Sequence, residues 1–260
     1  MTGLVISNQR GGVGKTTTAV NFAGYLAAQG KRVLLIDADS QGSVATYLGL
    51  RPEKFIVNLI IGKEPLARCI TRHSERLDVL CSNRETQQAE AALLGQMARE
   101  MALKFLLKQA DDVYDFAIID VAPSITLLQT CALVYARNML IPLDMDMLSL
   151  QGAQMSAEST RMVNEMYGID TRVVGFLPTQ VNHRHQVTDV VSSALTLLSK
   201  RTGIPVFTEI RTDQTVHKAS RQRQFLFDYD PKCKAAEDYL NAFGEITKVL
   251  EARNVEAKTA

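Results

Sequence analysis

Apolar runs along the chain alternate with segments that repeat apolar residues at helical spacing. The runs predict buried strands at Leu4–Ser7, Val33–Asp37, Leu77–Cys81, Phe116–Asp120, Met139–Pro142, Val173–Pro178 and Pro205–Thr208. The other segments predict helices, among them Thr16–Gln29, Glu85–Gln109, Ser149–Tyr167 and Cys233–Arg253. This alternation is typical of an α/β fold: a mainly parallel, twisted sheet with helices on both faces.

The chain reads as one domain. No repeat, low-complexity tract or long linker divides it, so we expect residues 1–254 to form a single unit and residues 255–260 a disordered C-terminal tail. With 260 residues, 46% of them hydrophobic, the chain can bury a sizeable core. It has no run of about 18 apolar residues and no basic and apolar leader, so we expect neither a membrane span nor a secreted protein. The four scattered cysteines favour buried thiols in a reducing cytoplasm.

Charge is unevenly distributed although the net charge is only +1. Residues 172–224 carry eight Lys or Arg against three Asp or Glu, an excess of +5. A local basic excess is a feature of nucleic-acid binding, which depends on where the charge is clustered.

A glycine-rich segment lies between the first predicted strand and the first predicted helix. It reads Arg-Gly-Gly-Val-Gly-Lys-Thr-Thr over residues 10–17. Such a turn lets backbone N–H groups converge on phosphate, aided by the helix dipole. Lys15 can reach the β- and γ-phosphates, and the Thr16 hydroxyl can ligate Mg²⁺. We therefore predict a nucleoside triphosphate site that comprises Gly11, Gly12, Val13, Gly14, Lys15, Thr16 and Thr17.

Carboxylates follow two of the predicted strands. Asp37 and Asp39 come directly after one buried run, and Asp120 ends another in the form of a Walker B motif. Ligands bind at the carboxyl ends of parallel strands, so all three should face the nucleotide. Asp120 is expected to hold Mg²⁺ through a water molecule, because Mg²⁺ keeps much of its hydration shell.

Together these motifs resemble the deviant Walker A motif and associated motifs of the ParA/MinD group of dimerising ATPases, in particular the ParA/Soj-like branch. The resemblance runs from Asn8 to Asn21 and recurs at Asp37–Gly42 and Asp120–Ser124. It implies a P-loop NTPase fold, ATP and Mg²⁺ as cofactors, and slow ATP hydrolysis to ADP and phosphate.

The resemblance also implies roles for individual residues. Arg10 stands where the family usually has a lysine that reaches the nucleotide of the second subunit in an ATP-dependent homodimer. With Lys15 it would compensate phosphate charge during catalysis. Asp39 would position or activate the attacking water, and Asp37 would lie near the Mg²⁺ shell.

Beyond residue 180 the resemblance is weaker. It implies that Asn182 and Arg211 contact the nucleotide and that Arg184 lies at a DNA-facing edge. Lys218, Arg221 and Arg223 can meet phosphates of double-stranded DNA without sequence preference. The alternative is that this segment is only a solvated basic helix or loop.

The sequence therefore favours a ParA-like ATPase that partitions or positions DNA or another large cargo. The resemblance implies a nucleoid-associated cytoplasmic protein and a ParB-like or cargo-adaptor protein that stimulates hydrolysis. A MinD-like membrane-associated ATPase is one alternative, against which the polar segment 251–260 counts. A metabolic P-loop enzyme is the other, against which Arg10 counts.

Overall fold

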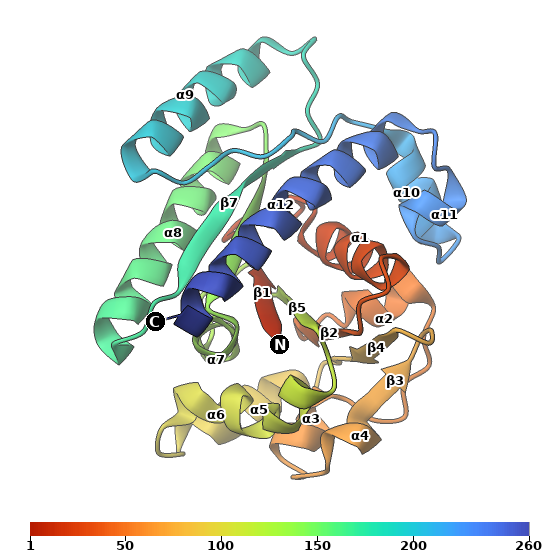
Figure 1. The fold of residues 1–260 in the computed structure, drawn as a ribbon, viewed down its shortest axis with the longest axis vertical. Coiled ribbons are helices and arrows are strands. Elements are labelled where there is room, and N and C mark those ends of the chain that lie inside the picture. The colour runs from red at the N-terminus through yellow and green to blue at the C-terminus, as the bar shows by residue number, and fades with distance from the viewer. Residues whose placement is uncertain (260) are drawn as a thin grey trace.

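The computed structural model describes residues 1–259, without the side chains of residue 254 and of residues 256–259. Its centre is a seven-stranded sheet in the order β3-β4-β2-β5-β1-β6-β7 (Figure 1). The strands are β1 Thr2–Ile6, β2 Val33–Ala38, β3 Ile70–Arg72, β4 Leu77–Leu80, β5 Phe116–Val121, β6 Asn138–Asp144 and β7 Arg172–Thr179. All neighbours are parallel except β3, which pairs antiparallel with β4. The predicted α/β fold is confirmed.

Helices cover both faces of this sheet. The longer ones are α1 Lys15–Ala28, α5 Thr86–Leu94, α7 Leu127–Ala136, α8 Met147–Tyr167, α9 Gln186–Thr202, α10 Gln214–Arg221 and α12 Lys234–Thr259. Shorter ones are α2 Ser43–Leu48, α3 Ile56–Ile60, α4 Leu66–Cys69, α6 Ala102–Leu106, α11 Leu226–Tyr229 and two 3₁₀ turns, Arg99–Met101 and Lys108–Asp112.

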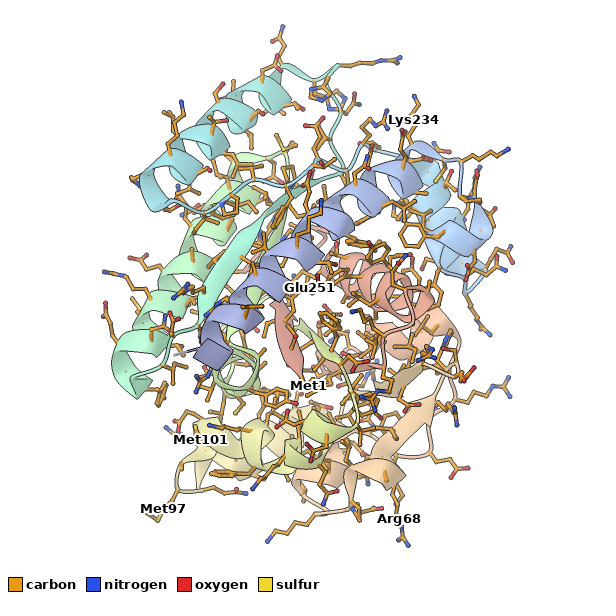
Figure 2. All side chains as sticks on the ribbon, in the orientation of Figure 1. Met1, Arg68, Met97, Met101, Lys234 and Glu251 are labelled. Carbon is orange, nitrogen blue, oxygen red and sulfur yellow. The ribbon has the colours of Figure 1, made fainter. Side chains whose placement is uncertain are left out.

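Side-chain alternation along the strands divides the core into two layers. On β1, Leu4 and Ile6 pack in one cluster with apolar residues of α1 and α12, whereas Val5 packs in the other with residues of α7 and α8. Successive strand residues face opposite sides of a sheet, so both layers follow from the pleat. Helix α12 runs diagonally across the sheet, with Lys234 at its start and Glu251 farther along it (Figures 1 and 2).

The structure corrects two expectations, the helix at 85–109 and the strand at 205–208. The helix expected at 85–109 ends at Leu94, and Gly95 is followed by a turn in which Ala98 has a φ of 51°. This turn leaves Met97 98% exposed at the lower edge of the molecule (Figure 2). Because Leu103 and Leu107 are fully buried, the chain re-enters the core by short helices rather than one straight helix.

The segment expected to form a strand at 205–208 makes only a single bridge, between Val206 and Phe176. Pro205 has no N–H to donate, so the segment follows the edge of β7 irregularly. At the C-terminus, α12 is described as far as Thr259 and Ala260 lies outside the described residues, so the disordered tail expected at 255–260 remains a prediction. Within residues 1–259 no helix is both long and apolar enough to span a bilayer.

Candidate functional site

The glycine-rich segment forms a phosphate-binding loop between β1 and α1. Gly12 and Gly14 have φ values of 80° and 81°, the left-handed conformation that side chains disfavour. Gly14 caps α1, so the free N–H groups of the first helical turn point into the loop. Strand β7 supports the loop from outside, because Thr179 Oγ1 donates to the Val13 carbonyl at 3.0 Å. The arrangement can hold the phosphates of a nucleotide.

Lys15 lies inside this loop and is only 8% exposed. Its Nζ donates to the Arg10 carbonyl at 2.7 Å. Burial lowers the pKa of Lys15, and the nearby carboxylates of Asp120 and Asp39 raise it in opposition. A cation in this position can compensate phosphate charge.

The register of the sheet brings the predicted carboxylates together. Asp37 on β2 and Asp120 on β5 are direct neighbours in the parallel ladder, and Asp39 follows two residues after Asp37. Thr16 Oγ1 donates to Asp120 Oδ2 at 2.6 Å, which joins the end of β5 to the start of α1. The residues expected to surround a nucleotide and its metal ion therefore meet at one edge of the sheet.

Asp120 is buried with one oxygen open. Its Oδ1 has no hydrogen-bond partner, although the residue is only 1% exposed. Burial is the main cause that raises the pKa of Asp120 to about 7, against the lowering effects of Thr16 and Lys15. An open carboxylate oxygen beside a threonine hydroxyl matches the oxygen ligands that Mg²⁺ prefers. Thr16 and Asp120 therefore fit the metal role expected for them.

Asp37 differs from Asp120 because both of its oxygens are engaged. Oδ1 accepts from the backbone N of Asp39 at 3.0 Å, and Oδ2 accepts from that of Val44 at 3.1 Å. Burial and the Asp120 carboxylate raise the pKa of Asp37 well above its usual value. These contacts hold the turn that presents Asp39, so the metal role expected of Asp37 remains a prediction.

Arg10 is exposed at the mouth of the loop, and Asn8 holds its backbone in place. Arg10 N donates to Asn8 Oδ1 at 3.0 Å, and Asn8 Nδ2 donates to the Pro142 carbonyl at 2.8 Å. Gly152 of α8 allows this approach: a Cβ there would lie 2.5 Å from Asn8 Oδ1. The loop start is thus fixed, while the Arg10 side chain is exposed.

A cavity of about 280 Å³ opens beside the loop. Its lining combines loop residues with residues of β7, α10 and α12, including Gly12, Thr17, Gln180, Ile210, Arg211, Gln214, His217 and Tyr239. Its size and mixed lining suit the base and sugar of a nucleotide.

Of the two residues expected at the nucleotide beyond position 180, Arg211 lines this cavity and Asn182 does not. The Arg211 guanidinium pairs with Asp238 at 2.6 Å and Glu237 at 3.2 Å, which ties the cavity wall to α12. Asn182 instead caps the next turn, where its Oδ1 accepts from Arg184 N at 3.1 Å.

Sequence reasoning missed Gln180, which is more closely engaged with the loop than either of these residues. Gln180 has a φ of 55°, and its Nε2 donates to the Gly12 carbonyl at 2.9 Å. Its position directly after β7 was the available signal.

The basic residues expected at DNA are all exposed and come from separate elements. Arg184 lies in the loop before α9, whereas Lys218 and Arg221 lie on α10. Figure 1 shows α9 and α10 well apart along the upper part of the molecule. Arg223 follows α10 and packs over α2, because a Cβ at Gly49 would lie 2.3 Å from its Cδ.

Comparison with known proteins agrees with this site. Residues 1–172 match the AAA domain family AAA_31. The chain is 31% identical over 248 residues to the sporulation initiation inhibitor protein Soj of Bacillus subtilis, covering 94% of this chain and 97% of that one.

Two solved structures share the fold. Cyanothece apo McdA superposes with a TM-score of 0.86 at 22% identity, over 96% of this chain and 99% of the other. The structure named cobyrinic acid a,c-diamide synthase from Mycobacterium smegmatis, with bound ATP analogue and magnesium, has a TM-score of 0.78 at 30% identity, over 92% and 91% of the two chains.

Proposed function

Because the chain belongs to the ParA/Soj family of partition ATPases, within the ParA/MinD superfamily, we propose that it is an ATP-driven positioning protein. It binds ATP with Mg²⁺, dimerises, associates with DNA without sequence preference, and returns to the monomer after slow hydrolysis. A ParB-like or adaptor protein on the cargo accelerates hydrolysis. The protein therefore resides on the nucleoid in the cytoplasm.

One observation carries the proposal: of the two cations in the loop, one is buried and the other is exposed. Lys15 is buried and bonded within its own loop, whereas Arg10 is exposed although its backbone is held by Asn8. Lys15 can serve the nucleotide of its own subunit. An exposed arginine at the loop mouth has the planar fork needed to hold phosphate oxygens of a second subunit.

Each residue of the site has a separate role in binding or hydrolysis. Lys15 leaves the Arg10 carbonyl and pairs with phosphate, together with the N–H groups of the loop. Thr16 and Asp120 hold Mg²⁺, which neutralises phosphate charge when bound. Asp39 orients the attacking water, since its position after β2 is fixed through Asp37. Phosphoryl transfer depends mainly on such positioning and electrostatics.

We expect DNA binding to depend on dimerisation, because one subunit alone presents only a few scattered basic residues. In one subunit the basic residues Arg184, Lys218, Arg221 and Arg223 are spread over separate elements. A dimer doubles the number of phosphate contacts, and the affinity of such contacts rises steeply with their number. Retention on DNA therefore requires ATP.

The decisive experiment measures mass in solution with a non-cleavable ATP mimic and Mg²⁺, and then DNA retardation with the mimic, ADP or no nucleotide. The protein is expected to be a dimer and to retard DNA only with the mimic. Arg10→Ala should remain a monomer, Arg10→Lys should dimerise, and Arg68→Ala, at the lower edge (Figure 2), should behave as the wild type. A wild-type monomer with the mimic bound would refute the proposal.

The DNA surface has its own test. Arg184→Ala combined with Lys218→Ala should remove DNA retardation and leave dimerisation unchanged. A double variant of equal charge, Arg68→Ala with Lys104→Ala, is the matched control. Unchanged retardation by the first variant would exclude this surface.

A metabolic ATP-dependent enzyme is the second candidate, favoured by the synthase name of a structure that is 30% identical. Such an enzyme couples ATP cleavage to an acceptor substrate. Phosphate release that is slow, needs no acceptor and is raised by DNA or a partner protein would exclude it.

A further inference from the structure

Gln129 is a buried amide in the first turn of α7, and the functions above do not use it. It is 3% exposed. Its backbone N donates to Thr126 Oγ1 at 3.1 Å, and its side-chain Nε2 donates to Ser7 Oγ at 2.9 Å. Gln129 therefore joins residues 121–126, which follow Asp120, to the end of strand β1: its backbone bonds to the first and its side chain to the second.

Ser7 continues this connection into the phosphate-binding loop. Its backbone N donates to the Leu140 carbonyl at 3.0 Å, which fixes it between β1 and β6. Asn8 follows directly and accepts from the backbone N of Arg10. Hydrogen bonds and backbone thus run without a break from Thr126 through Gln129 and Ser7 to Arg10.

A second hydrogen bond fixes the same end of α7 from another helix. The backbone N of Leu128 donates to Glu90 Oε1, on α5, at 2.9 Å. The first turn of α7 therefore has three anchors: α5, residues 121–126 and β1. Of these anchors, the Gln129 side chain makes the one that reaches the nucleotide site.

The carboxamide oxygen of Gln129 is open. Among the described residues, Gln129 Oε1 and Asp120 Oδ1 are two of the few buried side-chain atoms with no hydrogen-bond partner. The metal role of Asp120 explains its open oxygen, but nothing in the resting site explains that of Gln129. Methionine fills the same space without an unsatisfied acceptor, so a purely structural role does not require an amide.

We propose that Gln129 is a positioning residue that couples residues 121–126 to the phosphate-binding loop. In the ATP state, Oε1 accepts a donor that these residues bring when they rearrange around the γ-phosphate, and the bond to Ser7 passes this change to the loop. The inference rests on the proposed ATPase function, and it names the residue through which the site distinguishes ATP from ADP.

The test compares two nucleotide states of one protein. Hydrogen–deuterium exchange at the amides of residues 121–128 is measured with Mg²⁺ and either a non-cleavable ATP mimic or ADP. The variant Gln129→Met keeps the volume and removes both polar atoms. Ser7→Ala removes the same bond from the other side with a smaller change, and Gln88→Met, at an exposed position on α5, is the matched control.

We expect the wild type and Gln88→Met to exchange more slowly with the mimic than with ADP at these amides. In Gln129→Met this difference should vanish and the preference for the mimic over ADP should fall by about tenfold, a typical coupling between sites, while ADP affinity stays within about twofold. Ser7→Ala should have the same effect, and the double variant should add little to it.

Two results would overturn the proposal. One is Gln129→Met with an unchanged exchange difference and nucleotide preference. The other is an equal loss of ADP affinity, mimic affinity and thermal stability, which indicates packing alone. The exchange experiment needs no dimer, so a wild type that stays monomeric refutes the proposed function while this experiment still decides the role of Gln129.

Discussion

The ammonium group of Lys15 donates a hydrogen bond to the carbonyl of Arg10, with 2.7 Å between Nζ and O. The backbone carbonyl of Arg10, whose side chain is exposed, thus holds the ammonium group of the buried Lys15. ATP must replace this bond with bonds to phosphate, so nucleotide binding changes the contact between the two residues. The loop that recognises phosphate is also the loop that presents Arg10 to a second subunit.

Lys15→Ala should weaken binding of ATP and leave the fold intact. Hydrogen bonds to a charged group contribute about 1.5–3 kcal/mol each, so we expect about a tenfold to hundredfold loss of affinity. Calorimetric titration with a non-cleavable ATP mimic measures it. Lys104→Ala, at an exposed lysine on α6, is the control. Equal affinities in both variants would contradict the assignment of Lys15 to phosphate.

Asp39→Ala should separate binding from hydrolysis. The side chain is held by the Gln41 backbone N, which donates to its Oδ1 at 3.0 Å, and it needs no contact with the base cavity. Loss of a residue that orients the nucleophile costs about a hundredfold or more in rate. Phosphate release should fall accordingly while affinity for the mimic changes little. Asp112→Ala is the control. A wild-type rate of hydrolysis in Asp39→Ala would show that another group positions the attacking water.

The site could be predicted from the sequence where neighbouring strand ends dictate its geometry. Asp37 and Asp120 end parallel strands, and the carboxyl ends of parallel strands lie at one edge of a sheet, so the strand assignments placed both at that edge. That β2 and β5 are direct neighbours is seen only in the structure. The glycine-rich turn was predictable for a similar reason, since β1, turn and α1 are consecutive in the chain.

Residues brought in from distant segments could not be predicted. Tyr239 and His217 reach the cavity from α12 and α10, whose positions depend on how long helices pack over the sheet. Gln129 gave no signal either, because its partner Ser7 is 122 residues away in the chain. The helix-forming composition of residues 85–109 also gave no sign that the helix ends at Leu94. The helix ends there because the chain must turn to bury Leu103 and Leu107.

The buried carboxylates predict how stability of the nucleotide-free protein depends on pH. The pKa of Asp120 is raised to about 7, so the folded state binds more protons than the unfolded state between its usual value, 3.8, and about 7. Stability must therefore fall as pH rises through this window, by up to about 1.4 kcal/mol per pH unit for one proton. Asp37, whose pKa is also raised, acts in the same direction.

Urea unfolding of the nucleotide-free protein between about pH 5 and pH 8 measures this slope. Asp120→Asn should flatten it and should be at least as stable as the wild type near neutral pH, because no charge is then buried. Asp112→Asn, at an exposed position, should keep the wild-type slope. An unchanged slope in Asp120→Asn would show that this carboxyl group is not the titrating one.

Gly152→Ala should disturb the start of the phosphate-binding loop from helix α8. The added Cβ would lie 2.5 Å from Asn8 Oδ1 and 3.2 Å from Arg10 N, so Asn8 or α8 must move. Overpacking of this kind costs about 1–3 kcal/mol of stability. Because Asn8 also holds the backbone of Arg10, the variant should lose dimerisation with the ATP mimic even where it remains folded.

The matched control is Gly95→Ala, where a Cβ would meet nothing within 4 Å and φ is −86°. Alanine there should be neutral or slightly stabilising, because it restricts the unfolded chain. Thermal unfolding and mass measurement of both variants with the mimic make the comparison. If Gly152→Ala dimerised as well as Gly95→Ala, the backbone of Arg10 would tolerate displacement. The guanidinium would then reach the second subunit without the support of α8, and precise placement of the loop start would have no part in assembly.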